Sequence, residues 1–335
     1  MENILDIFNR DAFGVVKMTE AINKVPANFS YLGGVEGLFK EEGSDTVAVA
    51  VEEREGRLSL IPNSKRGTQG NALPPTVRKV RPFTCFHKQI NDEILADQVQ
   101  GVRMFGSAVQ FETVMEKVTE KLAEAAADLE ITLEYMRVGA VKGQVLDADG
   151  SVITDLFTEF GQTKRSGTWN VASFSNGDIK KKCSELIRST RKVLGNEPMR
   201  GIEILCGDDI FDAIETSEEV REAHKWRNNS DFLVQSHTYS YFDYAGVRFV
   251  NYQGYIGDST FIGTKKAYLL PIGVRNLFSI IYAPADYIET VNKTGVKFYA
   301  KQDRMQMNKG IAMEYQTNPL VLCKRPAALY EITMP

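Results

Sequence analysis

The sequence contains few of the residues that most often bind metal ions, and none of them stands in a recognisable metal-binding motif. Among 335 residues there are four cysteines and three histidines. The cysteines are Cys85, Cys183, Cys206 and Cys323. They lie far apart and include no CxxC pair, so their spacing does not indicate a zinc site. We expect no bound metal, and four reduced, buried thiols that pack as small hydrophobic groups.

Signatures of enzymes are also absent. The sequence has no Gly-x-Gly-x-x-Gly after an expected strand, no Gly-x-Ser-x-Gly, no His-Glu-x-x-His and no kinase motif. The loop at 161–168 lacks the Gly-Lys-Ser/Thr ending of a phosphate-binding loop. His87, His224 and His237 have no partner at a fixed spacing and are interpreted as packing or surface histidines. We therefore predict no catalytic residue, no cofactor and no enzymatic activity.

One enzyme hypothesis stays open as the alternative, a hydrolase that uses a cluster of acidic residues. The cluster consists of Asp208, Asp209, Asp212 and Glu215. Carboxylates gathered in this way can bind a metal ion. Three acidic residues that open one helix more simply complement the dipole of that helix, and this is the preferred interpretation.

Long apolar runs and an excess of positive charge are missing as well. No run approaches the ~20 apolar residues needed to cross a bilayer, so we expect no contact with membranes. The chain begins with Met-Glu-Asn-Ile-Leu-Asp, which lacks a secretory pattern, so we expect synthesis and retention in the cytoplasm. A net charge of -4 argues against nucleic-acid binding as the main function. The basic helix expected at 177–194 could contact nucleic acid, but a solvated helix face is preferred.

The first part of the chain reads as an arm followed by a long hairpin. Glycines and Pro26 interrupt any periodicity before about residue 40, which predicts an extended arm lying on the same subunit or a neighbour. Alternating apolar residues predict strands at 46–51, 58–61 and 77–83, the first two joined by a charged turn at 52–56. Acidic residues precede basic ones along this hairpin. They form either a solvated face or a projection whose charges match a neighbouring subunit.

The strongest local pattern predicts one long helix at about 107–137. No glycine or proline interrupts it, and its apolar residues recur every three or four positions. They are Phe111, Met115, Val118, Leu122, Ala125, Leu129, Leu133 and Met136. A helix of this length spans roughly 45 Å, so we expect it to form a spine across the subunit.

The remainder predicts a mixed lobe, which places the chain in the α+β class. We expect a small hairpin from strands at 139–146 and 147–153, and a polar loop at 161–169. A helix at 177–194 should bury Ile179, Cys183, Leu186, Ile187 and Val193. After a strand at 202–206, an Asp N-cap should open a short helix. Further strands are expected at 246–252, 259–262, 266–271, 313–323 and 328–333.

Several late segments resemble the lambda-type major capsid proteins of tailed phages, the capsid E family. The resemblance lies in the segments YLLPIGV at 268–274, YAPADYIE at 282–289, KFYAKQ at 297–302 and EYQTNPL at 314–320. It extends over nearly the whole chain in the order of its elements. It implies the coat-protein fold of coliphage Hong Kong ninety-seven, with an arm, an extended loop, a spine helix, and peripheral and axial domains.

The resemblance also implies a division of the chain and a function. The arm would cover 1–40, the extended loop 41–88, the peripheral domain 89–174 and 291–335, and the axial domain 175–290. The protein would be the major capsid protein of a tailed bacteriophage or prophage, assembling into hexamers and pentamers of an icosahedral shell in the virion. That shell would enclose double-stranded DNA without sequence-specific binding. Expected partners are a separate scaffolding protein, a portal, a head maturation protease and a decoration protein.

Overall fold

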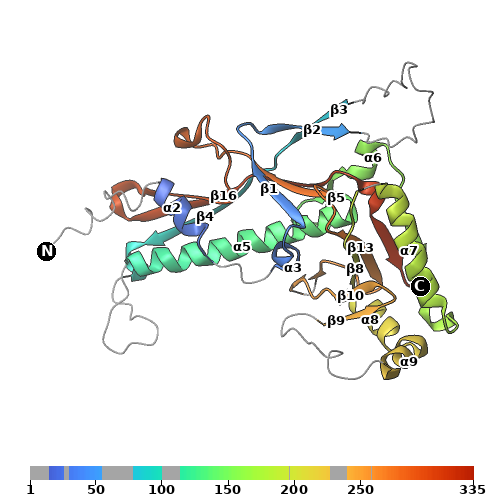
Figure 1. Cartoon of the computed structure of the whole chain (residues 1–335). Helices are drawn as coiled ribbons and strands as arrows, with labels where there is room; N and C mark the ends of the chain where they lie inside the picture. The colour runs from blue at the N-terminus through green and yellow to red at the C-terminus, as the bar shows by residue number, and fades with distance from the viewer. Residues whose placement is uncertain are drawn as a thin grey trace, which may run out of the picture.

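The computed structural model describes residues 15–25, 30–54, 78–99, 114–195, 197–226, 240–257 and 259–335. Helices and sheets alternate along these residues in mixed order, which confirms the predicted α+β class. Helix α5 crosses the molecule, with sheets on either side of it and helices α7, α8 and α9 gathered at one end (Figure 1). None of the helices in the described ranges is long and apolar enough to span a membrane.

Helix α5 (Val114–Lys142) is the predicted spine. The six predicted apolar residues from Val118 to Met136 are all buried against the main core, as the spacing required. The predicted end at residue 137 and the strand from 139 are wrong, because the helix continues through Gly139. It stops at Gly143, whose φ of +77° favours glycine and ends the helical path. The predicted start at 107–113 lies outside the described residues.

One three-stranded antiparallel sheet lies beside the spine in the order β15 (Tyr299–Arg304), β16 (Gly310–Thr317), β4 (Lys88–Leu95). Helix α2 (Val15–Ile22) packs on β15, and Met18 and Ile22 are buried there. The short helix α4 (Ala96–Val99) follows β4. Residues 313–323 were predicted as one strand, but they belong to two, β16 and β17, which break at Asn318.

A second three-stranded sheet joins the arm to the core. Its order is β1 (Phe39–Gly43), β14 (Phe278–Tyr282), β17 (Pro319–Cys323), with β1 parallel to β14. Helix α3 (Tyr31–Gly34) precedes β1, and Leu32 is fully buried. The described part of the predicted arm therefore packs on its own subunit, and its buried apolar residues are not exposed for a neighbour.

The largest sheet has six strands and builds the end of the molecule that carries helix α7 (Figure 1). Its order is β7 (Ser166–Thr168), β18 (Tyr330–Thr333), β13 (Lys266–Ile272), β8 (Gly201–Cys206), β10 (Val247–Asn251), β9 (Tyr241–Tyr244). Strand β7 lies within the predicted polar loop at 161–169. That loop prediction is wrong over three residues, because β7 pairs in parallel with β18, more than 160 residues away in the chain.

Helices α7 (Asp178–Leu194), α8 (Asp208–Glu215) and α9 (Glu218–Trp226) accompany this sheet. Four of the five residues predicted to face inward on α7 are buried or half-buried, but Val193 is 39% exposed and Leu194 is buried instead. The expected Asp N-cap of α8 is also wrong. The cap is Gly207, and Asp208 stands in the first helical turn.

Three hairpins complete the part of the fold that the structure describes. Strands β2 (Ala48–Arg54) and β3 (Arg78–Thr84) pair over seven residues, so the charged turn predicted at 52–56 is wrong from 52 to 54. The strand expected at 58–61 lies outside the described residues. Strands β5 (Gln144–Leu146) and β6 (Val152–Asp155) form the predicted small hairpin, with Gly150 at a φ of +85°, and helix α6 (Leu156–Phe160) follows. Strands β11 (Tyr255–Ile256) and β12 (Ser259–Thr260) form the third.

Within the described ranges, four single turns of 3₁₀ helix connect these elements. They are η2 (Val171–Ser173), η3 (Ile288–Thr290), η4 (Gln306–Asn308) and η5 (Pro326–Ala328).

Candidate assembly surfaces

The β2–β3 hairpin projects from the body of the molecule (Figure 1). Its root is fixed to helix α6 by aromatic and cationic contacts. Phe83 of β3 stacks on Phe160, with ring centroids 6.0 Å apart. The guanidinium of Arg81 lies 5.2 Å from the centre of the same ring and donates a hydrogen bond to the carbonyl oxygen of Glu159. These contacts set the direction in which the hairpin leaves the subunit, while Val47 and Val80 stay more than half exposed at its root.

The arm is held to the spine by a buried carboxylate. Glu134 of α5 has no exposed surface, and its carboxylate accepts hydrogen bonds from the backbone N–H of Leu32 at 2.8 Å and the Ser30 hydroxyl at 2.8 Å. The Tyr252 hydroxyl donates to it at 3.1 Å. One side chain of the spine therefore joins the arm, through Ser30 and Leu32, to the segment that follows β10.

Arg137, one turn further along α5, completes an ionic cluster. Its guanidinium is 1% exposed and lies 2.9 Å from the carboxylate of Glu130 and 3.3 Å from that of Glu134. It also approaches Glu41 of β1 at 3.5 Å, and Lys297 pairs with Glu130. Burial alone would raise the pKa of Glu130, but Arg137 and Lys297 together hold that pKa below its ordinary value. The cluster thus connects the spine, the arm and the segment before β15.

This cluster was not predicted from the sequence. Its residues stand at spacings of four and three on α5, beside the apolar residues Leu129, Leu133 and Met136. Charged residues on the apolar face of a helix are the signal that could have revealed it, because a buried charge must be paired. The partners Ser30, Glu41 and Lys297 could not have been found from spacing, since they come from distant segments.

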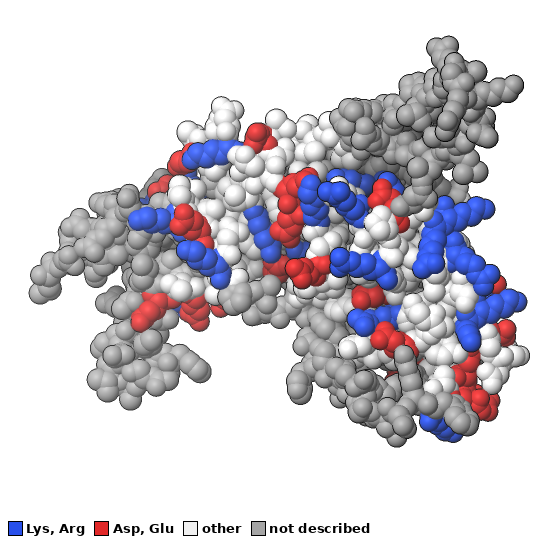
Figure 2. Space-filling view, viewed as in Figure 1, with Lys and Arg blue, Asp and Glu red and all other residues white. Residues whose placement is uncertain are grey.

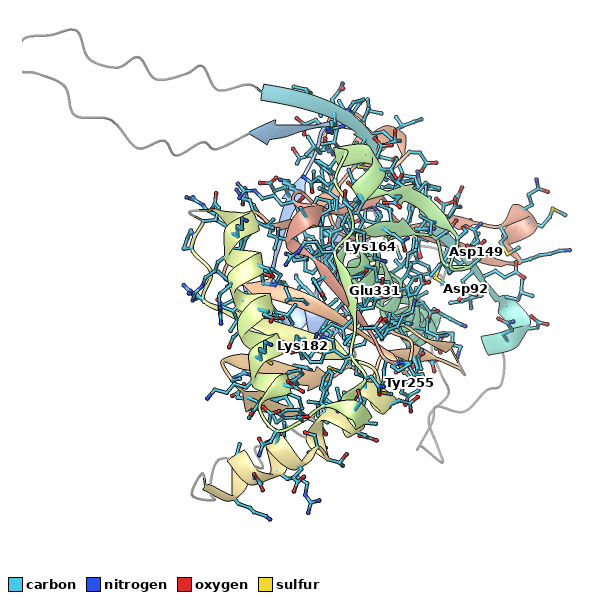
Figure 3. The ribbon with its side chains drawn as sticks, turned by 90° about the vertical axis from the view of Figure 1, so that its right-hand side faces the viewer. Asp92, Asp149, Lys164, Lys182, Tyr255 and Glu331 are labelled. Atoms are coloured by element: carbon cyan, nitrogen blue, oxygen red, sulfur yellow. The ribbon has the colours of Figure 1, made fainter. Side chains whose placement is uncertain are left out.

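Helix α7 presents its basic residues to solvent at the far end of the molecule. Lys180, Lys181, Arg188, Arg191 and Lys192 are all exposed. Figure 2 shows basic side chains gathered over this helix, and Figure 3 labels Lys182 on it.

The first turn of α7 is capped from another element. The carboxylate of Glu219 on α9 accepts hydrogen bonds from the backbone N–H groups of Ile179 at 3.0 Å and Lys180 at 2.9 Å. The Tyr244 hydroxyl donates to the same carboxylate at 2.7 Å. Burial raises the pKa of Tyr244, and the Glu219 carboxylate adds to that effect, so the hydroxyl stays a proton donor. The first turn of the helix that carries the basic face is therefore held to α9 and β9 through Glu219 and Tyr244.

The C-terminal strand is fixed by a further ionic group. Glu331 of β18 pairs with Lys164 at 2.5 Å and with Lys266 at 3.4 Å, and the Tyr268 hydroxyl donates to it at 3.0 Å. Figure 3 shows Lys164 and Glu331 side by side. Because Lys164 lies two residues before β7, these contacts hold the edge of the six-stranded sheet.

The acidic cluster proposed for a hydrolase does not converge. Asp208, Asp209 and Asp212 are exposed along α8, with Glu215 half-buried at its end. Burial raises the pKa of Glu215, and the nearby Asp212 adds to that effect. Across the described ranges, no three His, Cys, Asp or Glu side chains are placed to hold a metal ion.

The cysteines and His87 were predicted to have packing or surface roles, and the structure describes their surroundings. All four cysteines are free and buried, as predicted, and burial raises the pKa of the Cys85 thiol to about 11. His87 is hydrogen-bonded to Asn318 at 2.8 Å and to Gln89 at 3.1 Å. The side chain of His224 and all of His237 lie outside the described residues.

Large apolar side chains are exposed at separate places on the surface. Ile288 of η3 is 89% exposed, Met307 of η4 is 86% exposed and Tyr255 of β11 is 63% exposed. Single exposed apolar residues are common on monomers. Combined with a projecting hairpin and a basic helix, they provide several distinct surfaces on one subunit.

Comparison with known proteins gives a family and a fold. The family described as phage major capsid protein E matches residues 14–334. The major capsid protein of Salmonella phage Felix O1 is 22% identical, over 96% of this chain and 96% of the relative. The major capsid protein of Pseudomonas phage KPP10 is 23% identical, over 79% of this chain and 81% of the relative.

Solved structures with the same fold are also phage capsids. The chain superposes on a subunit of the mature capsid of bacteriophage PhiM1 with a TM-score of 0.54 at 11% identity, covering 93% of this chain and 90% of that one. For the capsid of cyanophage P-SCSP1u the TM-score is 0.51 at 10% identity, covering 93% and 91%. The fold is thus the Hong Kong ninety-seven type expected from the sequence.

Proposed function

The chain belongs to the phage major capsid protein E family and is a major capsid protein of a tailed phage, and from this premise we propose how it builds a shell. Copies associate into hexamers and pentamers, and these join into an icosahedral shell that encloses double-stranded DNA without sequence-specific contacts. The family match over residues 14–334 carries the proposal. The protein is accordingly a component of the virion, made in the cytoplasm of a bacterial host.

The distribution of surfaces supports assembly by heterologous contacts. A closed shell requires each subunit to present different patches to different neighbours. The projecting β2–β3 hairpin, the basic face of α7 and the exposed apolar residues Ile288, Met307 and Tyr255 are at different places on this subunit. We infer that the hairpin reaches an adjacent subunit. The ionic cluster around Arg137 would keep the arm on its own subunit.

The proposal also divides the chain into four parts. They are an arm at 1–40, an extended loop at 41–88, a peripheral domain at 89–174 and 291–335, and an axial domain at 175–290. The six-stranded sheet draws β8, β9, β10 and β13 from the axial range and takes β18 and β7 from the peripheral ranges. The two domains would thus share a sheet, which supports a rigid connection between them.

The proposed partners follow from the same premise. They are a separate scaffolding protein, a portal, a head maturation protease and a decoration protein. We also propose that the chain has no enzymatic activity, since family membership indicates a structural protein and the acidic residues of α8 do not converge.

Negative-stain microscopy combined with light scattering on the purified full chain tests the proposal. The chain is expressed alone and together with a candidate scaffolding protein. Closed shells, tubes, or isolated hexamers and pentamers are the expected products. A monomer or dimer under every condition would contradict assembly and would favour the hydrolase alternative.

A further inference from the structure

One of the two chain segments that join the projecting β2–β3 hairpin to the rest of the subunit contains a histidine. This segment, residues 85–87, connects β3 to β4 of the sheet β15–β16–β4 (Figure 1). The backbone N–H of Cys85 donates to the carbonyl oxygen of Val47 at 2.9 Å, and that of Phe86 donates to the carbonyl oxygen of Pro319 at 3.1 Å. A change in this segment would therefore alter how the hairpin is attached.

Both ring nitrogens of His87 face the oxygen atom of a side-chain amide. Nδ1 lies 2.8 Å from Oδ1 of Asn318, and Nε2 lies 3.1 Å from Oε1 of Gln89. An amide oxygen only accepts hydrogen bonds, so a ring nitrogen opposite it must carry a proton to bond to it. The neutral imidazole has one N–H and satisfies one of the two oxygens, whereas the charged ring satisfies both.

The orientation of the Asn318 amide is fixed by hydrogen bonds that begin at two carboxylates. Nε2 of Gln316 donates to Asp286 at 2.7 Å and to Glu314 at 2.9 Å. The oxygen of Gln316 then points the other way and accepts from Nδ2 of Asn318 at 3.4 Å. The same Nδ2 donates to the carbonyl oxygen of Pro284 at 3.3 Å. Oδ1 of Asn318 is therefore left to face the imidazole, which must donate to it through Nδ1.

The amide on the other side of the ring is also engaged. Nε2 of Gln89 donates to Oδ1 of Asn91 at 2.8 Å. If Nε2 of His87 lost its proton, Gln89 would have to turn its amide over to stay bonded to the ring. That turn would bring Oε1 of Gln89 against Oδ1 of Asn91, and two oxygens without a proton between them repel. Deprotonation thus breaks a hydrogen bond in either arrangement.

The charges around the ring also favour its protonated form. Burial would lower the pKa of His87, but the hydrogen bonds to its two amide neighbours and the carboxylates of Asp286 and Glu314 raise it. Asp286 comes from the segment before η3 and Glu314 from β16, so two different elements direct negative charge at the ring. Lys88, the next residue along the chain, pairs with Asp147 of the β5–β6 hairpin.

We propose that His87 is a pH-sensitive switch at the attachment of the β2–β3 hairpin, whose charged ring holds segment 85–87 to the break between β16 and β17. Asn318, at that break, is 5% exposed, and its carbonyl oxygen accepts from the backbone N–H of Ala283 at 2.9 Å, so it is a fixed anchor. The inference concerns the single subunit and does not depend on assembly.

The direction of the pH effect follows from the protonation of the ring. The pKa of His87 in the folded protein is raised above its unfolded value of about 6.5. The stabilising contribution of the charged ring is therefore complete below the unfolded value and is lost as the pH rises through the folded one. The attachment should be firm in mildly acidic solution and looser in alkaline solution.

Hydrogen exchange measured by mass spectrometry on the full chain tests the switch at the amides that it would control. Protection of peptides covering residues 84–88 is compared at pH 6 and pH 9, after correction for the intrinsic exchange rates. We expect protection to fall about threefold or more at pH 9, because the amides of Cys85 and Phe86 open more often. The far end of β4, where the backbone N–H of Ala96 donates to Lys309 at 3.0 Å, is the internal control and should keep its protection.

Two substitutions at the same position separate the effect of the proton from that of the side chain. His87→Gln is neutral throughout this range and should show low protection at both pH values. His87→Arg keeps a positive charge and N–H donors, so it should show high protection at both. Burial lowers the pKa of Lys142 to about 8, so this lysine titrates in the same range, but all three proteins contain it. A wild type without the fall, or an equal fall in His87→Gln, would overturn the inference.

NMR titration of ¹³C-labelled histidine gives an independent measurement, with His87→Gln identifying the signal. The pKa of His87 should lie above the ordinary value of about 6.5. Gln89→Leu removes the exposed acceptor opposite Nε2 and should lower that pKa. Gln98→Leu, which removes an exposed glutamine beyond the other end of β4, should leave it unchanged. An ordinary pKa in the wild type, or one that Gln89→Leu does not alter, would contradict the proposed role.

Discussion

At the scale of single residues, the arm is most sensitive at Glu134. This carboxylate accepts hydrogen bonds from Leu32, Ser30 and Tyr252, and it pairs with Arg137 in a site closed to water. Removing one partner from a buried ionic group leaves the others uncompensated. The stability of the subunit therefore depends on this side chain more than on any exposed ion pair of the same helix.

Glu134→Leu should lower the free energy of unfolding by about 3–5 kcal/mol, because Arg137 and four donors, among them the backbone N–H of Gly33, lose their acceptor. Glu120→Leu, which removes an exposed partner of Lys117 on the same helix, is the control and should change it by less than about 1 kcal/mol. Urea unfolding followed by circular dichroism measures both. Equal losses in the two variants would show that the buried cluster has no special role.

Glu130 should make stability depend on pH in the acidic range. Its pKa in the folded protein is lowered, so its stabilising contribution is complete above the unfolded value of about 4.3. The contribution is lost as the pH falls through the lower, folded value. Unfolding free energies of the wild type and Glu130→Gln should therefore differ by a constant amount between pH 5 and 7 and converge toward pH 3. A difference that is unchanged at pH 3 would contradict this assignment.

At the scale of elements, the local sequence pattern predicted the positions of the helices better than the residues at which they end. The apolar spacing of α5 was sufficient to place the spine, since a helical face needs no distant information. Its end was wrong because Gly139 tolerates the helix while packing close to Gln144 and Leu146. Strand β7 was missed because three polar residues become a strand only by pairing with β18.

The two glycines that follow α5 and α6 allow a matched test of what stops these helices. Gly143 and Gly161 both have positive φ, but an added Cβ would meet the Phe157 ring at 2.3 Å from Gly143 and nothing within 4 Å from Gly161. Gly161→Ala should cost about 1–2 kcal/mol from the left-handed backbone alone. Gly143→Ala should cost about 1–3 kcal/mol more through the clash. Thermal unfolding of both variants measures the two losses of stability. Equal losses would show that the clash with the Phe157 ring does not contribute.

At the scale of the whole molecule, the order of elements was predictable and their pairing was not. The resemblance of the late segments gave the fold type, while the sheets join strands from distant parts of the chain, such as β1 with β14. The ionic cluster likewise draws Ser30, Glu130 and Lys297 from three regions. Spacing along one helix cannot reveal partners of this kind, because sequence distance bears no relation to their contact.

Exposed apolar side chains are where contacts between subunits of the proposed shell can be tested, and Ile288 is the clearest case because it is 89% exposed on η3. In the isolated subunit, Ile288→Asp should change the free energy of unfolding by less than about 0.5 kcal/mol, since the side chain has few contacts to lose. If a neighbour covers it, burial contributes roughly 1.5–3 kcal/mol, which corresponds to about a tenfold or larger rise in the critical concentration for assembly.

Light scattering across a concentration series measures that critical concentration, and urea unfolding of the unassembled chain confirms that the variant is folded. Val152→Asp, at an exposed valine of the β5–β6 hairpin, tests whether any apolar-to-acidic change on the surface acts in the same way. An unchanged critical concentration for Ile288→Asp would place η3 on a surface that stays open to solvent in the shell. A rise confined to Ile288→Asp would place η3 in a contact between subunits. Salt should weaken that contact much less than a contact between charged surfaces, because salt screens charges but does not weaken apolar burial.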